Sequence, residues 1–132
     1  MSAVLRPSVE DLRLIGFYLG RVLTGLGLLM LVPLPLAAVL REWNALSALL
    51  LGAGIALTLG ALADAHLRSR RQLGWSHGMV VVALAWIVGS AVAAVPMHVS
   101  GRFADPLAAL FEAASALTTT GMSVINDLDH LE

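Results

Sequence analysis

The sequence predicts an all-α integral membrane protein, on three observations. First, 58% of its 132 residues are hydrophobic and only 13% are charged, whereas an average soluble domain carries about 25% charged residues. Second, the mean hydropathy is +0.85. Third, residues 22–40, 43–63 and 78–97 contain no charged side chain, and each stretch is close to the roughly 20 residues that a helix needs to cross a bilayer. We therefore expect three transmembrane helices.

The charge balance and the motifs that are missing exclude several classes of function. The formal net charge of −1 offers no basic surface, so we expect no nucleic-acid partner. The absence of cysteine excludes disulfides and thiolate sites. The sequence contains no phosphate loop, dinucleotide fingerprint or nucleophile elbow. We therefore expect that the chain is not an enzyme.

The first helix is expected to begin near Asp11, because the residues that follow are mostly apolar. Arg13 and Arg21 interrupt this stretch, but their long side chains can extend toward the membrane surface. Pro33 and Pro35 are expected to end or kink the helix. A secretory signal peptide is the alternative, but the apolar run exceeds the usual 7–15 or so residues and no clear cleavage site follows.

The distribution of arginines predicts the orientation of the helices. One side of the predicted membrane carries more of them: Arg6, Arg13, Arg68, Arg70 and Arg71 on that side, against Arg41 and Arg102 on the other. Because cytoplasmic loops retain an excess of arginine and lysine, we expect a multi-pass protein of the cytoplasmic (inner) membrane with a cytoplasmic N-terminus. Trp43 and Trp75 fall at the predicted starts of the second and third helices, where indole rings favour the headgroup zone.

Small residues recur at four-residue spacing in all three predicted spans. They are Gly16 and Gly20 in the first, Gly52, Ala56 and Gly60 in the second, and Ala85, Gly89 and Ala93 in the third. Such stripes allow helices to approach closely in lipid. The alternative is that glycine and alanine are simply abundant here. The spacing does not distinguish packing within the chain from packing between chains.

A fourth apolar segment, residues 106–117, is too short to cross a membrane. Asp105 is a suitable N-cap and Pro106 a suitable first helical residue. At 1.5 Å per residue the helix is about 18 Å long, roughly half of a membrane, and it runs directly into Thr118-Thr-Thr-Gly121. One interpretation is a re-entrant loop, with a pore helix and a filter loop. The other is a short amphipathic helix at the interface, followed by a threonine-rich turn.

The chemistry of the threonine-rich stretch suits a cation. If its backbone is extended, the carbonyl oxygens can replace the hydration shell of a potassium ion, and the threonine hydroxyls can add further oxygens. Gly121 can adopt backbone dihedrals that are unfavourable for other residues. The C-terminus of the preceding helix directs a partial negative charge to the same place.

The segment 105–125, D-P-L-A-A-L-F-E-A-A-S-A-L-T-T-T-G-M-S-V-I, resembles the first pore loop of the Trk-type potassium uptake proteins, the TrkH/KtrB family. The resemblance implies a fold of four helix–pore loop–helix repeats around one ion path. Residues 1–72 would form an N-terminal segment with two transmembrane helices. Residues 73–132 would supply the first helix, pore helix and filter loop of an incomplete repeat. Thr118, Thr119, Thr120 and Gly121 would then bind potassium as one quarter of the selectivity filter.

The resemblance also implies substrate and partners. Potassium would be the transported ion, with no cofactor, membrane lipid would surround the helices, and the family commonly forms a homodimer with a cytoplasmic nucleotide-binding regulatory subunit. Because the sequence ends at Glu132, before the second helix of the first repeat, we expect an N-terminal fragment that does not conduct potassium alone. The alternative is a small three-span membrane protein with a structural or partner-anchoring role.

Other polar residues have open interpretations. Glu112 is either an intramembrane acid near the ion path or a brace behind the filter, and the resemblance favours the brace. Ser115 is expected to pack or to form a hydrogen bond. The residues Asp127, Asp129 and Glu132 either concentrate cations at the pore mouth or form a solvated loop.

The four histidines, His66, His77, His98 and His130, are expected on solvated surface. Their spacing to other potential ligands predicts no metal site. Asp64 and Arg68 are four residues apart and can pair if the second helix continues far enough.

Overall fold

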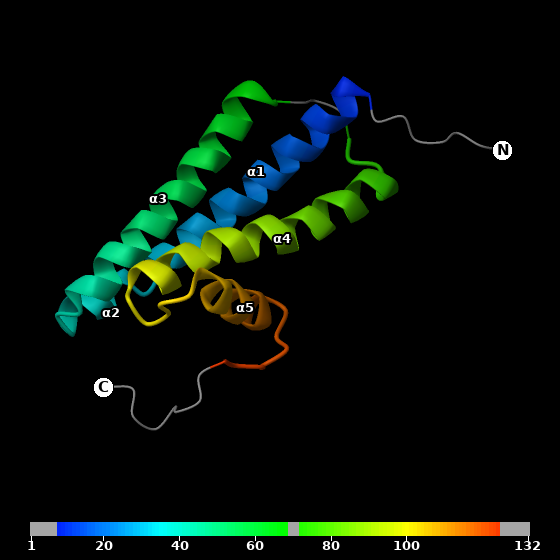
Figure 1. Ribbon diagram of the computed structural model, residues 1–132. Coiled ribbons are helices and arrows are strands. Elements are labelled where there is room, and N and C mark those ends of the chain that lie inside the picture. The colour runs from blue at the N-terminus through cyan, green and yellow to red at the C-terminus, as the bar shows by residue number, and fades with distance from the viewer. Residues whose placement is uncertain (1–7, 69–71, 125–132) are drawn as a thin grey trace.

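The computed structural model describes residues 8–68 and 72–124. All regular elements in these two ranges are α-helices, which confirms the predicted all-α fold. In chain order they are α1 (Val9–Leu31), α2 (Leu34–Val39), α3 (Trp43–His66), α4 (Trp75–Val99) and α5 (Pro106–Leu117) (Figure 1).

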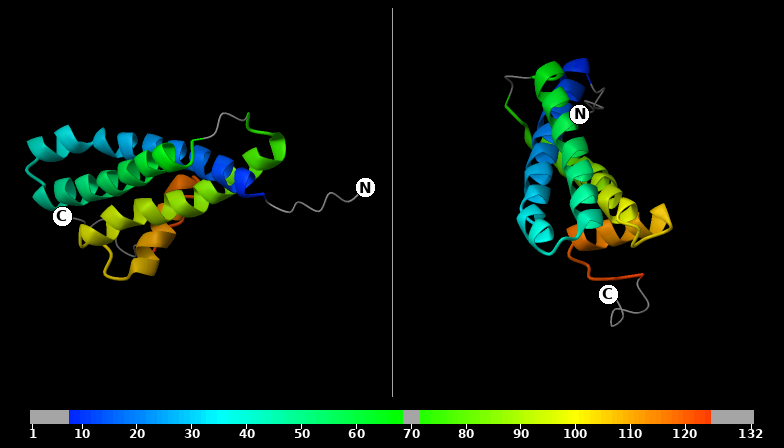
Figure 2. Two further views of the ribbon diagram at one scale, coloured as in Figure 1. Left: turned by 90° about the horizontal axis from the view of Figure 1, so that it is seen from above. Right: turned by 90° about the vertical axis from the view of Figure 1, so that its left-hand side faces the viewer.

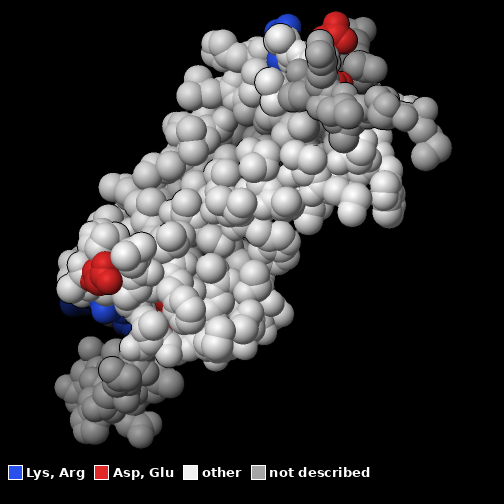
Figure 3. Space-filling view, turned by 45° about the vertical axis from the view of Figure 1, so that its right-hand side comes forward, with Lys and Arg blue, Asp and Glu red and all other residues white. Residues whose placement is uncertain are grey.

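The three long helices α1, α3 and α4 lie side by side and alternate in direction (Figure 1, Figure 2). We call one end of this bundle the α1 end, where α1 begins, α3 ends and α4 begins, and the other the α2 end, where α2 lies and α4 ends. On the face shown in Figure 3, charged side chains gather at the two ends, and the surface between them is almost wholly uncharged. All three spans are long and apolar enough to cross a membrane, as predicted.

The first span begins at Val9 rather than at Asp11, because Ser8 caps it. The Ser8 hydroxyl accepts a hydrogen bond from the Asp11 amide, 3.2 Å, and the Asp11 carboxylate accepts one from the Ser8 amide, 3.1 Å. This reciprocal capping box satisfies two backbone amides that the helix itself leaves unpaired. Asp11 therefore lies inside the first turn of α1.

Pro33 and Pro35 interrupt the first span as predicted. α1 ends at Leu31 and the short helix α2 follows. Arg41 then adopts a left-handed conformation, φ +59°, and the amide of Glu42 donates to the carbonyl of Ala37, 3.0 Å. This turn ends α2 and brings the chain directly into α3, so the two helices form a tight hairpin at the α2 end.

Helices α1 and α3 come close together at glycines from the predicted stripes. A methyl group on Gly60 would meet the hydroxyl of Thr24 and lie 2.9 Å from the carbonyl oxygen of Gly20. One on Gly20 would overlap Ala63. The stripes of the first two spans therefore pack within the chain, which the spacing alone left open.

Helix α4 packs against both of these helices. Leu23 of α1, Ala56 of α3 and Val92 of α4 form one buried cluster. Closer to the α2 end, Pro96 of α4 lies against Gly52, where a methyl group would come within 2.9 Å of the proline ring. Gly52 therefore lets α3 approach α4, and Gly60 lets it approach α1.

Large apolar side chains face outward, whereas most of the buried apolar residues are small. Exposed fractions reach 70% for Leu29, 87% for Trp75 and 67% for Ile87. An apolar exterior of this extent is unfavourable in water and favourable in lipid. Trp43 and Trp75 begin α3 and α4 at opposite ends of the bundle, as the sequence predicts.

Asp64 and Arg68 do not pair, because the second span does not continue far enough as a helix. α3 ends at His66, and Leu67 leaves the helical conformation with φ −112° and ψ 11°. Arg68 therefore does not follow Asp64 by one helical turn. Arg13 covers this helix end instead, by donating a hydrogen bond of 3.3 Å to the carbonyl of His66.

Several residues singled out in the sequence lie outside the described ranges. They are Arg6, Arg70, Arg71, Asp127, Asp129, His130 and Glu132.

Candidate cation site at the end of α5

Helix α5 begins as the sequence predicts. The carboxylate of Asp105 accepts a hydrogen bond from the amide of Leu107, 3.0 Å, and a proline occupies the first helical position. One face of α5 packs on α4 through the buried side chains of Ala109 and Ala113, which contact Ala94. These small side chains bring the two helix axes close together, so α5 is supported along one face by α4.

Helix α5 runs back along α4 and ends beside its middle (Figure 1). Pro106 shares a groove with Val99, the last residue of α4. At the other end of α5, Leu117 is a neighbour of Gly89. The 12 residues of α5 correspond to about 18 Å. The helix therefore returns about half of the way along α4.

A Schellman motif ends α5. The amide of Thr119 donates to the carbonyl of Ala116, 3.2 Å, and that of Thr120 donates to the carbonyl of Ser115, 3.0 Å. Thr119 adopts the left-handed conformation, φ +55°. The condition of an extended backbone, on which carbonyl coordination depends, is therefore not met at the first two threonines, which belong to the turn that closes the helix.

The left-handed conformation of Thr119 is a strained one. Glycine commonly occupies this position of the motif because it has no Cβ atom. A β-branched residue there is a genuine outlier, at a cost of about 1–2 kcal/mol. Strain of this kind is found at functional sites, where the surrounding structure maintains it.

After this turn the chain reverses and runs back beside α5. Gly121 has φ +74°, which supplies the conformational freedom that the sequence predicts for it. The hydroxyl of Ser115 donates to the carbonyl of Met122, 2.6 Å, and the amide of Val124 donates to the Glu112 carboxylate, 3.2 Å. Ser115 thus forms the expected hydrogen bond, and Glu112 acts as a brace.

The threonine hydroxyls direct their hydrogen atoms toward oxygen atoms of the chain itself. Thr118 Oγ1 donates to the carbonyl of Ala114, 2.7 Å, and lies 2.8 Å from Thr120 Oγ1. Thr119 Oγ1 donates to the carbonyl of Thr118, 2.7 Å. Since a hydroxyl has one hydrogen and two lone pairs, Thr120 must be the donor to Thr118. The three oxygens keep lone pairs that can face an ion.

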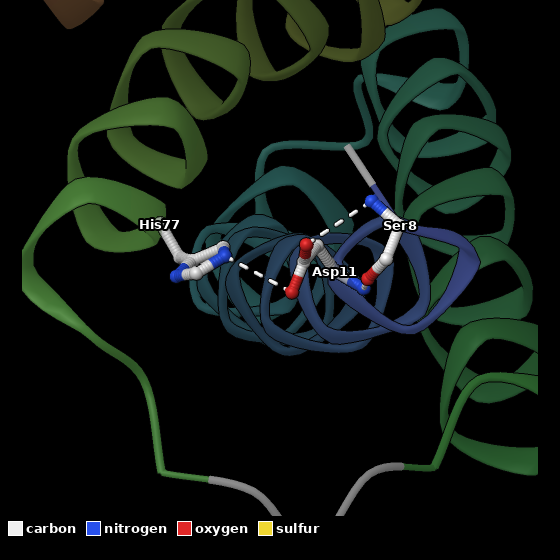
Figure 4. A network of polar contacts seen from close by, with 3 residues as sticks. All are labelled: Ser8, Asp11 and His77. Atoms are coloured by element: carbon white, nitrogen blue, oxygen red, sulfur yellow. Dashed lines mark hydrogen bonds and ion pairs between the residues drawn. The ribbon is translucent and has the colours of Figure 1, made fainter. Parts of the chain in front are cut away.

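The histidines take part in different local contacts. His66 lies 3.1 Å from the carbonyl of Leu62, and His98 lies 2.9 Å from that of Phe103. His77 is half-buried, and its Nε2 atom lies 3.2 Å from the Asp11 carboxylate (Figure 4).

His77 is therefore only partly exposed to solvent, and its pairing with Asp11 was not predicted. The sequence carries no signal for this pair, because α1 and α4 bring together residues that are far apart in the chain. Within the described ranges, no group of three histidine or acidic residues could hold a metal ion.

The chain resembles cation transporters over most of its length. It is 28% identical over 128 residues to an uncharacterized cation transporter of Methanocaldococcus jannaschii, an alignment that covers 97% of this chain and 27% of the relative. It is 34% identical over 125 residues to the Trk system potassium uptake protein TrkH of Halomonas elongata, covering 92% and 25%. It is 35% identical over 68 residues to the Trk system potassium uptake protein TrkG of Escherichia coli, covering 48% and 13%.

The first two relatives are much longer than this chain, which spans about a quarter of their length. No family model and no solved structure matches the chain. The relatives confirm the resemblance that the sequence of residues 105–125 indicates.

Proposed function

We propose that this chain, a relative of the Trk-type potassium uptake proteins, forms part of a path by which potassium ions cross the membrane. In this proposal Thr118, Thr119, Thr120 and Gly121 supply one quarter of a selectivity filter. Residues 1–72 are a peripheral pair of spans, and residues 73–132 belong to the first helix–pore loop–helix repeat.

The reversal of the chain at the end of α5 carries the proposal. Helix α5 ends beside the middle of α4, and the segment after it returns beside α5. This is the geometry of a re-entrant loop. If α4 crosses the bilayer, the turn after Leu117 lies at mid-depth. Irregular backbone at this depth is tolerated only where protein or a water-filled cavity surrounds it. In this proposal a water-filled cavity faces the turn and forms the ion path.

The chemistry of the turn favours a cation over an anion. The hydroxyl hydrogens of Thr118, Thr119 and Thr120 are engaged with oxygen atoms of the chain, so the hydroxyls present lone pairs outward. The C-terminus of α5 adds a partial negative charge. Oxygen ligands without a formal charge are those that potassium filters use in place of the hydration shell.

A single turn of this kind cannot enclose an ion, and residues 118–124 are exposed along the described chain. We propose that further pore loops surround the ion from the remaining sides, as the family resemblance implies. The homodimer, the cytoplasmic nucleotide-binding regulatory subunit, the inner-membrane location and the cytoplasmic N-terminus belong to the same proposal. On this view the 132-residue chain alone does not conduct potassium, and it has no enzymatic role.

A chimera tests this function. This chain would replace the matching first quarter of the Halomonas elongata TrkH protein, in a bacterial host that lacks its own potassium uptake systems. We expect growth on limiting potassium with the chimera and none with this chain alone. Thr118→Val should reduce growth with the chimera, because it removes the hydroxyl that links the turn to α5.

The matched control is Thr58→Val. Its hydroxyl likewise donates to a carbonyl of its own helix, Ile55, 2.9 Å, but it lies on α3. Growth with Thr58→Val should equal that of the unmodified chimera. A chimera that reaches the membrane and supports no growth, or one that tolerates Thr118→Val as well as Thr58→Val, would contradict the proposed function.

A further inference from the structure

A groove with a charged end lies between α1 and α3, away from the candidate cation site. Its volume is about 610 Å³. Arg21 and Asp64 supply its charged groups, and Leu28 and Leu57 line its apolar part. The remaining lining includes Gly25, where an added methyl group would meet no atom within 4 Å. The groove is therefore open at this glycine.

The two charged side chains of the groove do not neutralise each other. The Arg21 guanidinium lies 4.8 Å from the centre of the Phe17 ring, so it is directed back toward the α1 end. Among the described residues no carboxylate pairs with Arg21, and no hydrogen-bond donor or cation engages Asp64. A positive and a negative group thus stand in the same groove, each available to a ligand.

The charged groups of the groove lie toward the α1 end of the bundle, and its apolar side chains lie further in. Asp64 lies in the last turn of α3, nearest the α1 end. The backbone of Arg21 lies slightly deeper, because Arg21 follows Gly20, which packs against Gly60 and Ala63. Its guanidinium reaches back toward the α1 end, over the Phe17 ring. Leu28 is two turns of α1 deeper again. The groove therefore presents a carboxylate and a guanidinium at its α1 end, and apolar surface further in.

We propose that this groove binds a glycerophospholipid whose headgroup carries a primary ammonium, such as phosphatidylethanolamine. Such a lipid carries its ammonium and its phosphate together at one end and its acyl chains at the other. This matches Asp64 and Arg21 at the charged end of the groove and the leucines further in. Arginine binds phosphate oxygens through its planar fork of N–H donors. A primary ammonium donates hydrogen bonds to a carboxylate, and a quaternary choline group cannot.

The charge pattern also argues against an anionic lipid. Phosphatidylglycerol would satisfy Arg21, but it would leave Asp64 without a counter-charge beside a second negative group. The groove is therefore expected to discriminate between headgroups by their ammonium group, and between lipids and free phosphate by the acyl chains.

Native mass spectrometry of the purified full chain in detergent tests this site. The probes are phosphatidylethanolamine, phosphatidylcholine and phosphatidylglycerol with identical acyl chains. We expect phosphatidylethanolamine to bind about fivefold more tightly than the other two, the effect of one partly exposed charge pair. Asp64→Asn should abolish this preference, and Arg21→Gln should weaken the binding of all three lipids.

A steric variant separates binding in the groove from binding elsewhere. Gly25→Leu should fill the groove without disturbing the fold, and reduce lipid occupancy. Gly54→Leu is the matched control, because Gly54 is also an exposed helical glycine with no atom within 4 Å of an added methyl group. It should leave occupancy unchanged.

Three results would overturn the inference. They are equal binding of the three lipids, equal effects of Gly25→Leu and Gly54→Leu, and a change of oligomeric state in Gly25→Leu with unchanged lipid occupancy, which would make the groove a contact between copies of the chain. None of these results depends on potassium transport, so the lipid site and the proposed function fail separately.

Discussion

The hydroxyl of Ser115 donates a 2.6 Å hydrogen bond to the backbone carbonyl of Met122. Ser115 is buried in the last turns of α5, and Met122 lies beyond the turn at residues 118–121. The bond therefore joins the two arms of the reversal, and it shapes the candidate cation site without contributing an ion ligand itself.

Removal of this bond should loosen the returning segment. Ser115→Ala leaves the Met122 carbonyl without its partner, at a cost of about 1–2 kcal/mol. We expect backbone amides of residues 120–124 to exchange roughly tenfold faster with deuterium, measured by mass spectrometry in detergent. The control is Ser90→Ala, since Ser90 is equally buried but donates within its own helix to the Trp86 carbonyl, 2.6 Å. Equal exchange in the two variants would show that the hydrogen bond from Ser115 to Met122 does not hold the returning segment against α5.

Glu112 should act through its acceptor atom rather than its charge. Its carboxylate accepts from the amide of Val124, and Glu112→Gln keeps an oxygen acceptor at that position. We expect Glu112→Gln to retain slow exchange at Val124 and Glu112→Ala to lose it. The same amide-exchange measurement applies. If Glu112→Gln behaved like Glu112→Ala, the negative charge would be essential and the brace would be an incomplete description.

The contact between α1 and α3 should be sensitive to a single methyl group. Gly60→Ala places Cβ against the Thr24 hydroxyl and the Gly20 carbonyl, and overpacking of this kind costs about 1–3 kcal/mol. Gly54→Ala on the same helix meets open space and should be neutral or slightly stabilising. Thermal unfolding in detergent compares the two variants. A midpoint for Gly60→Ala at or above that of Gly54→Ala would contradict the described packing.

The pair of Asp11 and His77 should contribute weakly to the junction of α1 with α4. Both side chains are partly exposed, so solvent screens the interaction. A double-mutant cycle with Asp11→Asn and His77→Gln isolates it from the capping role of Asp11. We expect a small favourable coupling, well below the effect of Gly60→Ala on the same unfolding midpoint. Strictly additive effects would mean that the two groups do not interact in the membrane protein.

Local signals in the sequence predicted most helix boundaries. Asp105 and the proline after it determine the start of α5, because cap and first-turn chemistry depends only on neighbouring residues. Trp43 and Trp75 mark helix starts for a similar reason, namely the preference of indole for the membrane interface. The spacing of Gly20 and Gly60 predicted close packing, but not which surfaces would meet.

Other features depend on tertiary structure and have no local signature. A glycine or asparagine would have identified the left-handed position that ends α5, but Thr119 occupies it. The contact of His77 with Asp11 requires the fold to bring α1 and α4 together. The groove that Arg21 and Asp64 share becomes visible only when α1 and α3 are aligned side by side.

The central claim is that the turn at residues 118–121 binds the transported ion, and Gly121 tests it most directly. Gly121 and Gly101 have similar positive φ values, +74° and +79°, and an added methyl group meets no atom within 4 Å at either. Alanine therefore imposes a similar backbone strain at both positions, about 1–2 kcal/mol, but only Gly121 lies in the candidate site.

The measurement is influx of radiolabelled rubidium, a potassium substitute, into cells that express the chimera with Gly121→Ala or Gly101→Ala. We predict that Gly121→Ala lowers influx by about five- to thirtyfold, which corresponds to a distortion of the site by about 1–2 kcal/mol, and that Gly101→Ala retains most of the influx. Equal influx through the two variants at equal protein levels would contradict the assignment of this turn as the potassium site.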